Sequence, residues 1–185
     1  NNLMAYIERK LFTLNTGHAI TAYFGYLKGH NTIDESINDE KIYNFVKKAM
    51  IESGKGLVTK HNFNEEAHLK YIDKIIKRFK NPYLKDDVSR VGREPLRKLN
   101  ENDRLIKPLM TARGFNINTD NLLLGVGAAL HYNNKQDKQS VELQTLIKDK
   151  GVKNTLSEIA KLPDDNEILD KLEYYYNKVE SIIAN

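Results

Sequence analysis

Residues 10–18 carry the sequence Lys10-Leu11-Phe12-Thr13-Leu14-Asn15-Thr16-Gly17-His18, which sets three polar groups in an apolar segment. Around it, apolar residues recur at three- and four-residue intervals, which predicts a helix over about 3–27. At about 100° per residue, Asn15 lies about 140° and His18 about 80° around the helix axis from Lys10. The three side chains therefore share one half of the helix surface, where they can line one wall of a pocket.

The remaining sequence has the same helical periodicity, and no run of strand length alternates between apolar and polar residues. Gly29 ends the first helix, whose inward side we expect to consist of Tyr6, Ile7, Leu11, Leu14 and Ala22. A polar loop follows over 31–36, and residues 81–103 are irregular and charged. Further helices are predicted at about 39–53, with a continuation past Gly54 and Gly56, and at 65–80, 104–113, 121–132, 138–148, 152–162 and 166–183.

Several of these helices have a recognisable start. Asn64, followed by Glu65 and Glu66, fits an N-cap with acidic first-turn residues. We expect Asp103 to cap the helix at 104–113, and we expect the pairs Thr119-Asp120 and Asp164-Asp165 to open later helices. Within the helix at 121–132, Gly125 and Gly127 are small residues that let two helices approach closely. The predicted fold class is all-α, with residues 1–185 forming one multi-helix domain.

Composition narrows the chemistry that this domain can perform. The chain has no cysteine, which excludes disulfides and thiolate chemistry and fits a reducing, cytoplasmic setting. No apolar run is long enough to span a bilayer, and the N-terminus lacks the pattern of a signal peptide. The net charge of +4 is spread among interspersed signs, whereas nucleic-acid binders concentrate positive charge on one face. The histidines lack metal-site spacing, so we expect no metal. From the apolar runs and the charge distribution, we also expect no membrane or nucleic-acid partner.

From periodicity alone, the segment at 10–18 has two interpretations. In the structural one, Lys10 extends along an apolar surface with its charge in water, while Asn15 and His18 are hydrogen-bonded core residues. In the functional one, the three groups act on a substrate. A non-catalytic helical module that binds an acidic partner is a further alternative, and a steep salt dependence of DNA binding would indicate it.

The segment resembles the Lys-x4-Asn-x2-His signature of the polyol-specific long-chain dehydrogenases. Its fuller form, from Glu8 to Ala19, is similar to the mannitol-1-phosphate 5-dehydrogenase branch of that family. Two more blocks agree in order and spacing. They are Phe79, Asn81, Leu84 and Asp86 followed by Arg90-Val91-Gly92-Arg93-Glu94-Pro95-Leu96-Arg97-Lys98-Leu99, and then Asp103-Arg104-Leu105-Ile106-Lys107-Pro108-Leu109. Beyond about residue 135 the resemblance is loose.

The resemblance implies a fold of the 6-phosphogluconate-dehydrogenase C-terminal-like type. It also implies that NAD is bound mainly by an N-terminal Rossmann domain, which this chain lacks and which would be its partner. Lys10 would be the general base, which requires desolvation because a free lysine titrates near ~10.4. Asn15 would hold the reacting oxygen, together with an asparagine of the other domain, and His18 would orient the substrate.

The resemblance also implies a sugar-phosphate substrate, with D-mannitol 1-phosphate and D-fructose 6-phosphate interconverted. Arg93 would bind the substrate, since arginine pairs with phosphate through two hydrogen bonds. Further candidates for the phosphate are Arg97, Lys98, Arg104 and Lys107, for each of which a structural salt bridge is an equal alternative. Within the same family, a hexonate or an unphosphorylated polyol remains open as the substrate. Without a cofactor domain, we expect the isolated chain to be nearly inactive.

Overall fold

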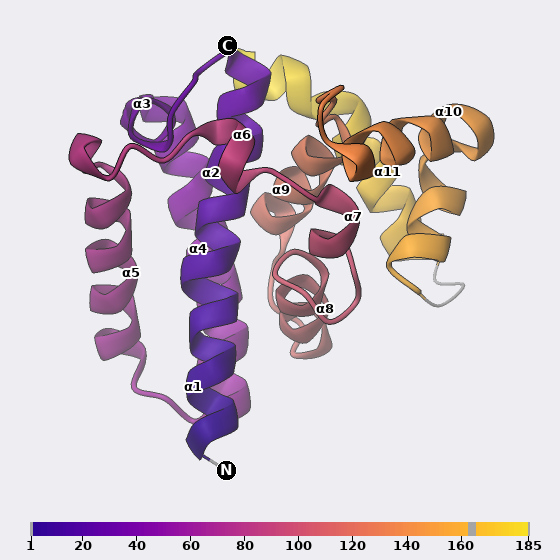
Figure 1. Ribbon diagram of the computed structural model, residues 1–185. Coiled ribbons are helices and arrows are strands. Elements are labelled where there is room, and N and C mark those ends of the chain that lie inside the picture. Colours follow the sequence, from indigo (N-terminus) through magenta and orange to yellow (C-terminus); the bar gives the residue numbers. More distant parts are fainter. Residues whose placement is uncertain (1, 163–165, 185) are drawn as a thin grey trace.

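The computed structural model describes residues 2–162 and 166–184, which form an all-helical fold without a strand (Figure 1). Its elements in chain order are α1 (Asn2–Lys10), the π-helix η1 (Leu11–Asn15), α2 (Thr16–Lys28), α3 (Ile33–Asn38), α4 (Glu40–His61), α5 (Glu65–Phe79), the 3-10 helix η2 (Pro82–Leu84), α6 (Val88–Val91), α7 (Pro95–Lys98), α8 (Ile106–Gly114), α9 (Asp120–Leu130), α10 (Lys138–Ile159) and α11 (Asn166–Ala184). None of the helices in the described part of the chain is both long and apolar enough to cross a membrane.

The predicted first helix is a single rod made of three pieces, α1, η1 and α2, which run end to end in Figure 1. Its middle piece differs from the prediction, because the backbone N–H of Thr16 bonds to the carbonyl of Leu11, five residues back. This spacing defines a π-helix, a wider turn that often occurs at functional sites. Gly29 ends the rod in the left-handed conformation with φ of 79°, as predicted.

The inward side predicted for the start of this rod was wrong. Tyr6 and Ile7 are exposed, at 56% and 53%, whereas the buried residues of α1 are Ala5 and Glu8. The 3.6-residue periodicity could not distinguish the two faces, because α1 is apolar on the side that faces solvent. Beyond the π-helix the prediction improves, and Ala22 is fully buried.

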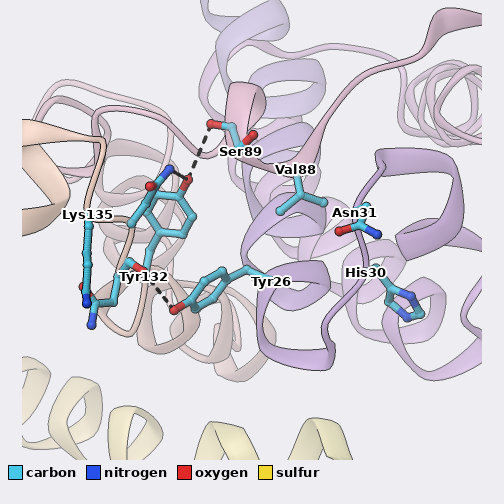
Figure 2. Close-up of a pocket in the computed structure, with 9 residues that line it drawn as sticks. Tyr26, His30, Asn31, Val88, Ser89, Tyr132 and Lys135 are labelled. Atoms are coloured by element: carbon cyan, nitrogen blue, oxygen red, sulfur yellow. Dashed lines mark hydrogen bonds between the residues drawn. The ribbon is translucent and has the colours of Figure 1, made fainter.

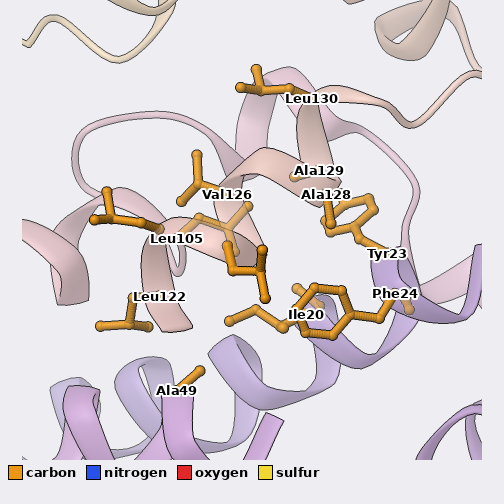
Figure 3. Close-up of a cluster of buried hydrophobic side chains, with 14 of the residues drawn as sticks. Ile20, Tyr23, Phe24, Ala49, Leu105, Leu122, Val126, Ala128, Ala129 and Leu130 are labelled. Carbon is orange, nitrogen blue, oxygen red and sulfur yellow. The ribbon is translucent and has the colours of Figure 1, made fainter. Parts of the chain in front are cut away.

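The core lies between α2, α4 and α9, where Figure 3 shows Ile20 and Phe24 of α2 packed towards Ala49 of α4 and Val126 of α9. As predicted, α4 continues through its two glycines as far as His61. Its expected inward residues are fully buried except for Phe45, which is partly buried against the core. A helix that buries one full stripe derives most of its stability from such packing.

The predicted loop at 31–36 is largely a short helix, α3. Thr32 caps it by accepting a hydrogen bond from the backbone N–H of Glu35, and Ile33 and Ile37 are buried. The polar composition of this stretch hid two apolar residues spaced by one helical turn. Thr32 also forms an isolated antiparallel bridge with Asp87, which attaches α3 to the segment before α6.

The predicted helix caps had mixed outcomes. Asn64 caps α5 by accepting from the N–H of Ala67. Asp103 does not cap α8, because its carboxylate accepts instead from the backbone and side chain of Arg104. Thr119 makes no side-chain cap for α9, whose first N–H groups bond to the buried carboxylate of Glu52. The pair Asp164-Asp165 lies outside the described residues.

The small residues of α9 let two helices approach closely, as predicted: Gly125 faces Ile20 of α2, and Gly127 faces α11. A Cβ on Gly127 would stand 2.9 Å from the backbone carbonyl carbon of Tyr175 in α11. The two helices predicted at 138–148 and 152–162 are present; they share the label α10 and are separated at Gly151, whose backbone is not helical, with φ of 82°. Tyr174 is exposed while its two tyrosine neighbours pack against the core.

A buried carboxylate fastens α1 to the rest of the fold. Glu8 is only 2% exposed. Its oxygens lie 2.9 Å from Lys60 Nζ, 2.8 Å from His61 Nε2 and 2.7 Å from Lys107 Nζ. Burial by itself raises the pKa of Glu8, but the hydrogen bonds from these cations lower that pKa to about 2.

The close approach at Gly127 can be tested by Gly127→Ala. We expect the free energy of unfolding to fall by about 1–2 kcal/mol, because the new methyl group meets backbone atoms that cannot rotate away. Urea denaturation measures this. Gly114→Ala is the matched control, since a Cβ there enters open space. An unchanged or higher stability for Gly127→Ala would contradict the packing.

The Glu8 ion pairs predict an acid-dependent stability. The folded-state pKa of Glu8, about 2, lies below its ordinary value of 4.5, so the stabilisation is complete above pH 4.5 and is lost as the pH falls towards 2. Glu8→Gln should lower the free energy of unfolding by about 2–3 kcal/mol near pH 7. Thermal unfolding of both proteins across this range should show the difference shrinking below pH 4.5. A difference that stays constant down to pH 2 would disprove the assignment.

Candidate functional site

Lys10 is the last residue of α1, and its side chain is exposed. It shares a face of α1 with Leu3, Tyr6 and Ile7, which lie three or four residues apart and are each more than half exposed. Lys10 has no ion pair with any other residue in the described part of the chain. Apolar side chains therefore flank Lys10, but Lys10 itself is exposed, and the desolvation expected for a base is not present in this chain.

The π-helix changes the geometry inferred for Asn15. In a π-helical turn the hydrogen bonds join residues five apart, so such residues come nearly into line, as residues four apart do in an α-helix. Lys10 and Asn15 are five apart and flank this turn. Asn15 is consequently rotated towards the face of Lys10, and the two polar groups lie closer around the axis than a regular helix would place them.

His18 lies in α2 as a partly buried imidazole. Its ring stacks on Phe79 with centroids 5.1 Å apart, and its Nε2 lies 3.4 Å from Asp86 Oδ2. The pKa of His18 is lowered to about 4, mainly by burial; Asp86 opposes this shift, and the charge of Arg90 adds to it. His18 is therefore neutral at pH 7. A neutral imidazole suits hydrogen bonding to a hydroxyl group, which is the orienting role expected from the sequence.

Lys98 is buried at 2% exposure at the end of α7, where its Nζ donates to the carbonyl of Arg93. Burial lowers the pKa of Lys98 to about 7, and the guanidinium groups of Arg104, Arg97 and Arg93 contribute to the same shift. Four of the five predicted anion-binding residues therefore converge. Such a lowered pKa together with a cationic environment is typical of functional sites.

We call these four residues the cationic cluster: Arg93, Arg97, Lys98 and Arg104. Its arginines have acidic neighbours. Glu94 lies 3.7 Å from Arg93 Nε and 3.4 Å from Arg97 Nε, and Asp103 lies 2.8 Å from Arg104 Nε. Arg93 and Arg97 are about half exposed, so their pairs are weak and can be exchanged for another anion. The cluster retains more positive than negative charge in this arrangement.

Lys107 does not join this cluster. Its Nζ pairs with Glu8, on the buried side of α1. Of the two alternatives left open for Lys107, the structure shows the salt bridge.

Two hydrogen bonds hold the cationic segment against the rod that carries Lys10. Thr16, next to Asn15, places its hydroxyl 2.6 Å from the carbonyl of Arg104. Tyr23 donates to the carbonyl of Gly92 at 3.0 Å from a fully buried position. These bonds bring the loop at 92–104 to α2, although the two segments are about 80 residues apart in sequence.

Two cavities lie near these groups. One, of about 640 Å³, is open and is lined by Arg90, Arg93, Glu94 and residues of 134–139. The other, of about 430 Å³, is shown in Figure 2 between Tyr26, Tyr132 and Val88. Tyr26 follows Lys10 by 16 residues, a helical rise of roughly 24 Å. Ser89 and Asn134 line both cavities, so the two lie side by side; Arg93 of the cationic cluster lines the first.

Residues 2–162 and 166–184 contain neither a cluster of metal-binding side chains nor the glycine-rich unit that typically binds dinucleotides. They hold no group of three acidic or histidine side chains arranged to bind a metal ion. They also lack a strand followed by a glycine-rich turn and a helix, the usual unit for binding the pyrophosphate of a dinucleotide.

Three residues around the site were not singled out as site residues from the sequence. Asp86 and Arg90 flank His18, and both belong to a block that was recognised, at helical spacing from each other. Glu8, two residues before Lys10, is an acid in a buried position of α1. Its long-range partners gave no sequence signal, since α4 and α8 are far from it along the chain.

Two solved structures share this fold. Pseudomonas fluorescens mannitol 2-dehydrogenase, in a ternary complex with NAD and D-mannitol, superposes with a TM-score of 0.78 at 18% identity, over 97% of this chain and 40% of that one. D-sorbitol dehydrogenase in substrate-free form gives 0.77 at 16% identity, over 98% and 41%. The chain thus spans less than half the length of either. At such identities the likeness shows the fold alone.

The family itself follows from the sequence. Residues 2–180 match the family described as the mannitol dehydrogenase C-terminal domain, which includes all three blocks and every residue of the candidate site. The chain belongs to this family of polyol dehydrogenase C-terminal domains.

Proposed function

We propose that this chain is the substrate-binding and catalytic-base domain of an NAD-dependent dehydrogenase that interconverts D-mannitol 1-phosphate and D-fructose 6-phosphate. The observation that supports this most is the position of the cationic cluster beside the rod of Lys10, Asn15 and His18. A reactive group and anion-binding groups on adjoining segments fit a polyol with a terminal phosphate.

In this proposal Lys10 accepts the hydroxyl proton of the secondary alcohol that is oxidised. NAD bound elsewhere in the enzyme would accept the hydride. A lysine works as a base when it is withdrawn from water. The apolar side chains of Leu3, Tyr6 and Ile7 supply one side of such a dry environment, and the other side must come from whatever covers them.

The other two groups of the rod hold the substrate. Asn15, rotated towards Lys10 by the π-helix, donates its amide N–H to the reacting oxygen as negative charge develops there, a contact typically worth about 10²–10³ in rate. His18, neutral and stacked on Phe79 beside Asp86, hydrogen-bonds a neighbouring hydroxyl. These roles divide the work between proton removal, charge stabilisation and orientation.

The cofactor-binding part of the enzyme is the proposed partner of this domain. Large apolar side chains rarely gather on a solvent-facing helix unless something docks there. The exposed side of α1 holds several, and Lys10 lies among them. A Rossmann domain seated on this face would both cover the base and bring the dinucleotide to the alcohol carbon. The larger size of the two solved relatives fits such a domain.

An unphosphorylated polyol is the second candidate substrate. One of the structures that share this fold is a complex with D-mannitol. For such a substrate, the cluster around Lys98 would bind hydroxyl groups or serve the fold. A phosphate is favoured here because several cations, one of them buried, converge where two surface acids neutralise only part of their charge.

The role of Lys10 is tested by Lys10→Ala in the full-length enzyme. We expect the turnover of D-mannitol 1-phosphate with NAD to be abolished while the fold persists, because the exposed side chain contributes little packing. Steady-state assays and circular dichroism measure the two effects. Near-normal turnover would remove Lys10 from the mechanism. Robust turnover by the isolated chain would refute the division of roles between two domains.

The phosphate site is tested by Arg97→Gln in the full-length enzyme. Losing one charge-assisted hydrogen bond to phosphate should raise KM for D-mannitol 1-phosphate about 10- to 100-fold. The kinetic constants for D-mannitol should change little. The matched control is Lys150→Gln, which removes a cation paired with Glu158 on the surface of α10. Equal effects on both substrates would favour the unphosphorylated polyol.

A further inference from the structure

The two sides of α1 have opposite characters. One side holds Tyr6, Ile7 and Lys10 and faces solvent, whereas the other is buried and holds Ala5 and Glu8. Glu8 and Lys10 are about 200° apart around the helix axis. The carboxylate therefore lies behind the helix that presents the lysine, and it cannot contact a substrate that reaches Lys10.

Glu8 joins α1 to two other helices at once. Its Oε1 accepts from His61 at the end of α4, and its Oε2 contacts Lys107 of α8, while Lys60 of α4 lies within reach of both oxygens. Arg9 makes a weaker contact with another helix, since its guanidinium lies over the ring of Tyr71 of α5 at 4.1 Å. Glu8 is thus the buried fixed point that sets the rotation of α1.

A second fixed point lies just after Lys10. In η1, the carbonyl of Phe12 accepts a buried hydrogen bond of 2.7 Å from Ser53 of α4. Lys10 is two residues from each of these anchors. A helix held on both sides cannot turn or slide there. The Cα of Lys10 is therefore fixed, even though its ammonium group is exposed.

We propose that Glu8 is a positioning residue for Lys10. This inference rests on the proposed function, because it assumes that Lys10 is the base. Releasing Glu8 frees the N-terminal side of the lysine while the Ser53 bond still holds the C-terminal side. Lys10 then samples orientations from which it cannot reach the hydroxyl proton. A misplacement of about 1 Å can cost about 10²-fold in rate.

The experiment compares Glu8→Gln and Glu8→Asp with Glu52→Gln in the full-length enzyme. Glu52 is the matched control, since it is also a buried carboxylate, with bonds to Asn121 and Leu122 at the start of α9. All assays are run at a temperature where each variant is fully folded. We expect Glu8→Gln to lower kcat about 10²-fold with little change in KM. Glu8→Asp, which keeps the charge, should recover part of kcat, and Glu52→Gln should keep it.

Hydrogen exchange supplies a readout that is independent of catalysis. In Glu8→Gln, the amides of residues 2–10 should exchange faster while those of α9 do not. Faster exchange confined to this segment together with the kcat loss supports the proposal. A normal kcat in Glu8→Gln, or an equal loss in Glu52→Gln, overturns it. If the unaltered enzyme oxidises no polyol, the proposed function fails, and unchanged exchange would then separately show that Glu8 does not fix α1.

Discussion

Two hydroxyl groups hold the π-helical turn at Leu11–Asn15. Ser53 donates to the carbonyl of Phe12 at 2.7 Å, and Thr16 places its Oγ1 2.9 Å from the carbonyl of Leu11 and 2.6 Å from that of Arg104. A π-helical turn is rare because its backbone geometry is less favourable than that of an α-helix. Here neighbouring elements satisfy its carbonyls. The turn rotates Asn15 towards Lys10, and Thr16 brings the loop of the cationic cluster to the same rod.

The sequence predicted the helices well wherever burial follows a 3.6-residue period. Helix α4 and its continuation through two glycines, the Asn64 cap and the close packing at Gly127 were all predicted from local residue types. The π-helix was not, since its stabilising hydroxyls come partly from residues far away in sequence. The inward face of α1 was misassigned. Apolar periodicity indicates that a helix has an apolar side, but it does not indicate whether this chain buries that side.

In the candidate site, too, local features were predictable from the sequence and long-range contacts were not. Types and spacing pointed to Lys10, Asn15 and His18, and the structure sets them on one rod with the cationic cluster beside it. The burial of Lys98 could not be foreseen, since lysine is rarely buried and the three arginines around it come from a folded loop. The partner of Lys107 was equally hidden, because Glu8 lies about 100 residues earlier in the chain.

Two charged groups in this domain are buried in opposite electrostatic settings. Glu8 is surrounded by cations, which lower its pKa and keep it ionised, so it serves as a permanent anchor. Burial lowers the pKa of Lys98 to about 7, and the cations around it act in the same direction, so its charge depends on what binds nearby. An arriving phosphate would restore that charge, because an anion favours the protonated lysine. Under the proposed function, the anion-binding end therefore responds to the substrate, while the helix of the base is held in place before the substrate arrives.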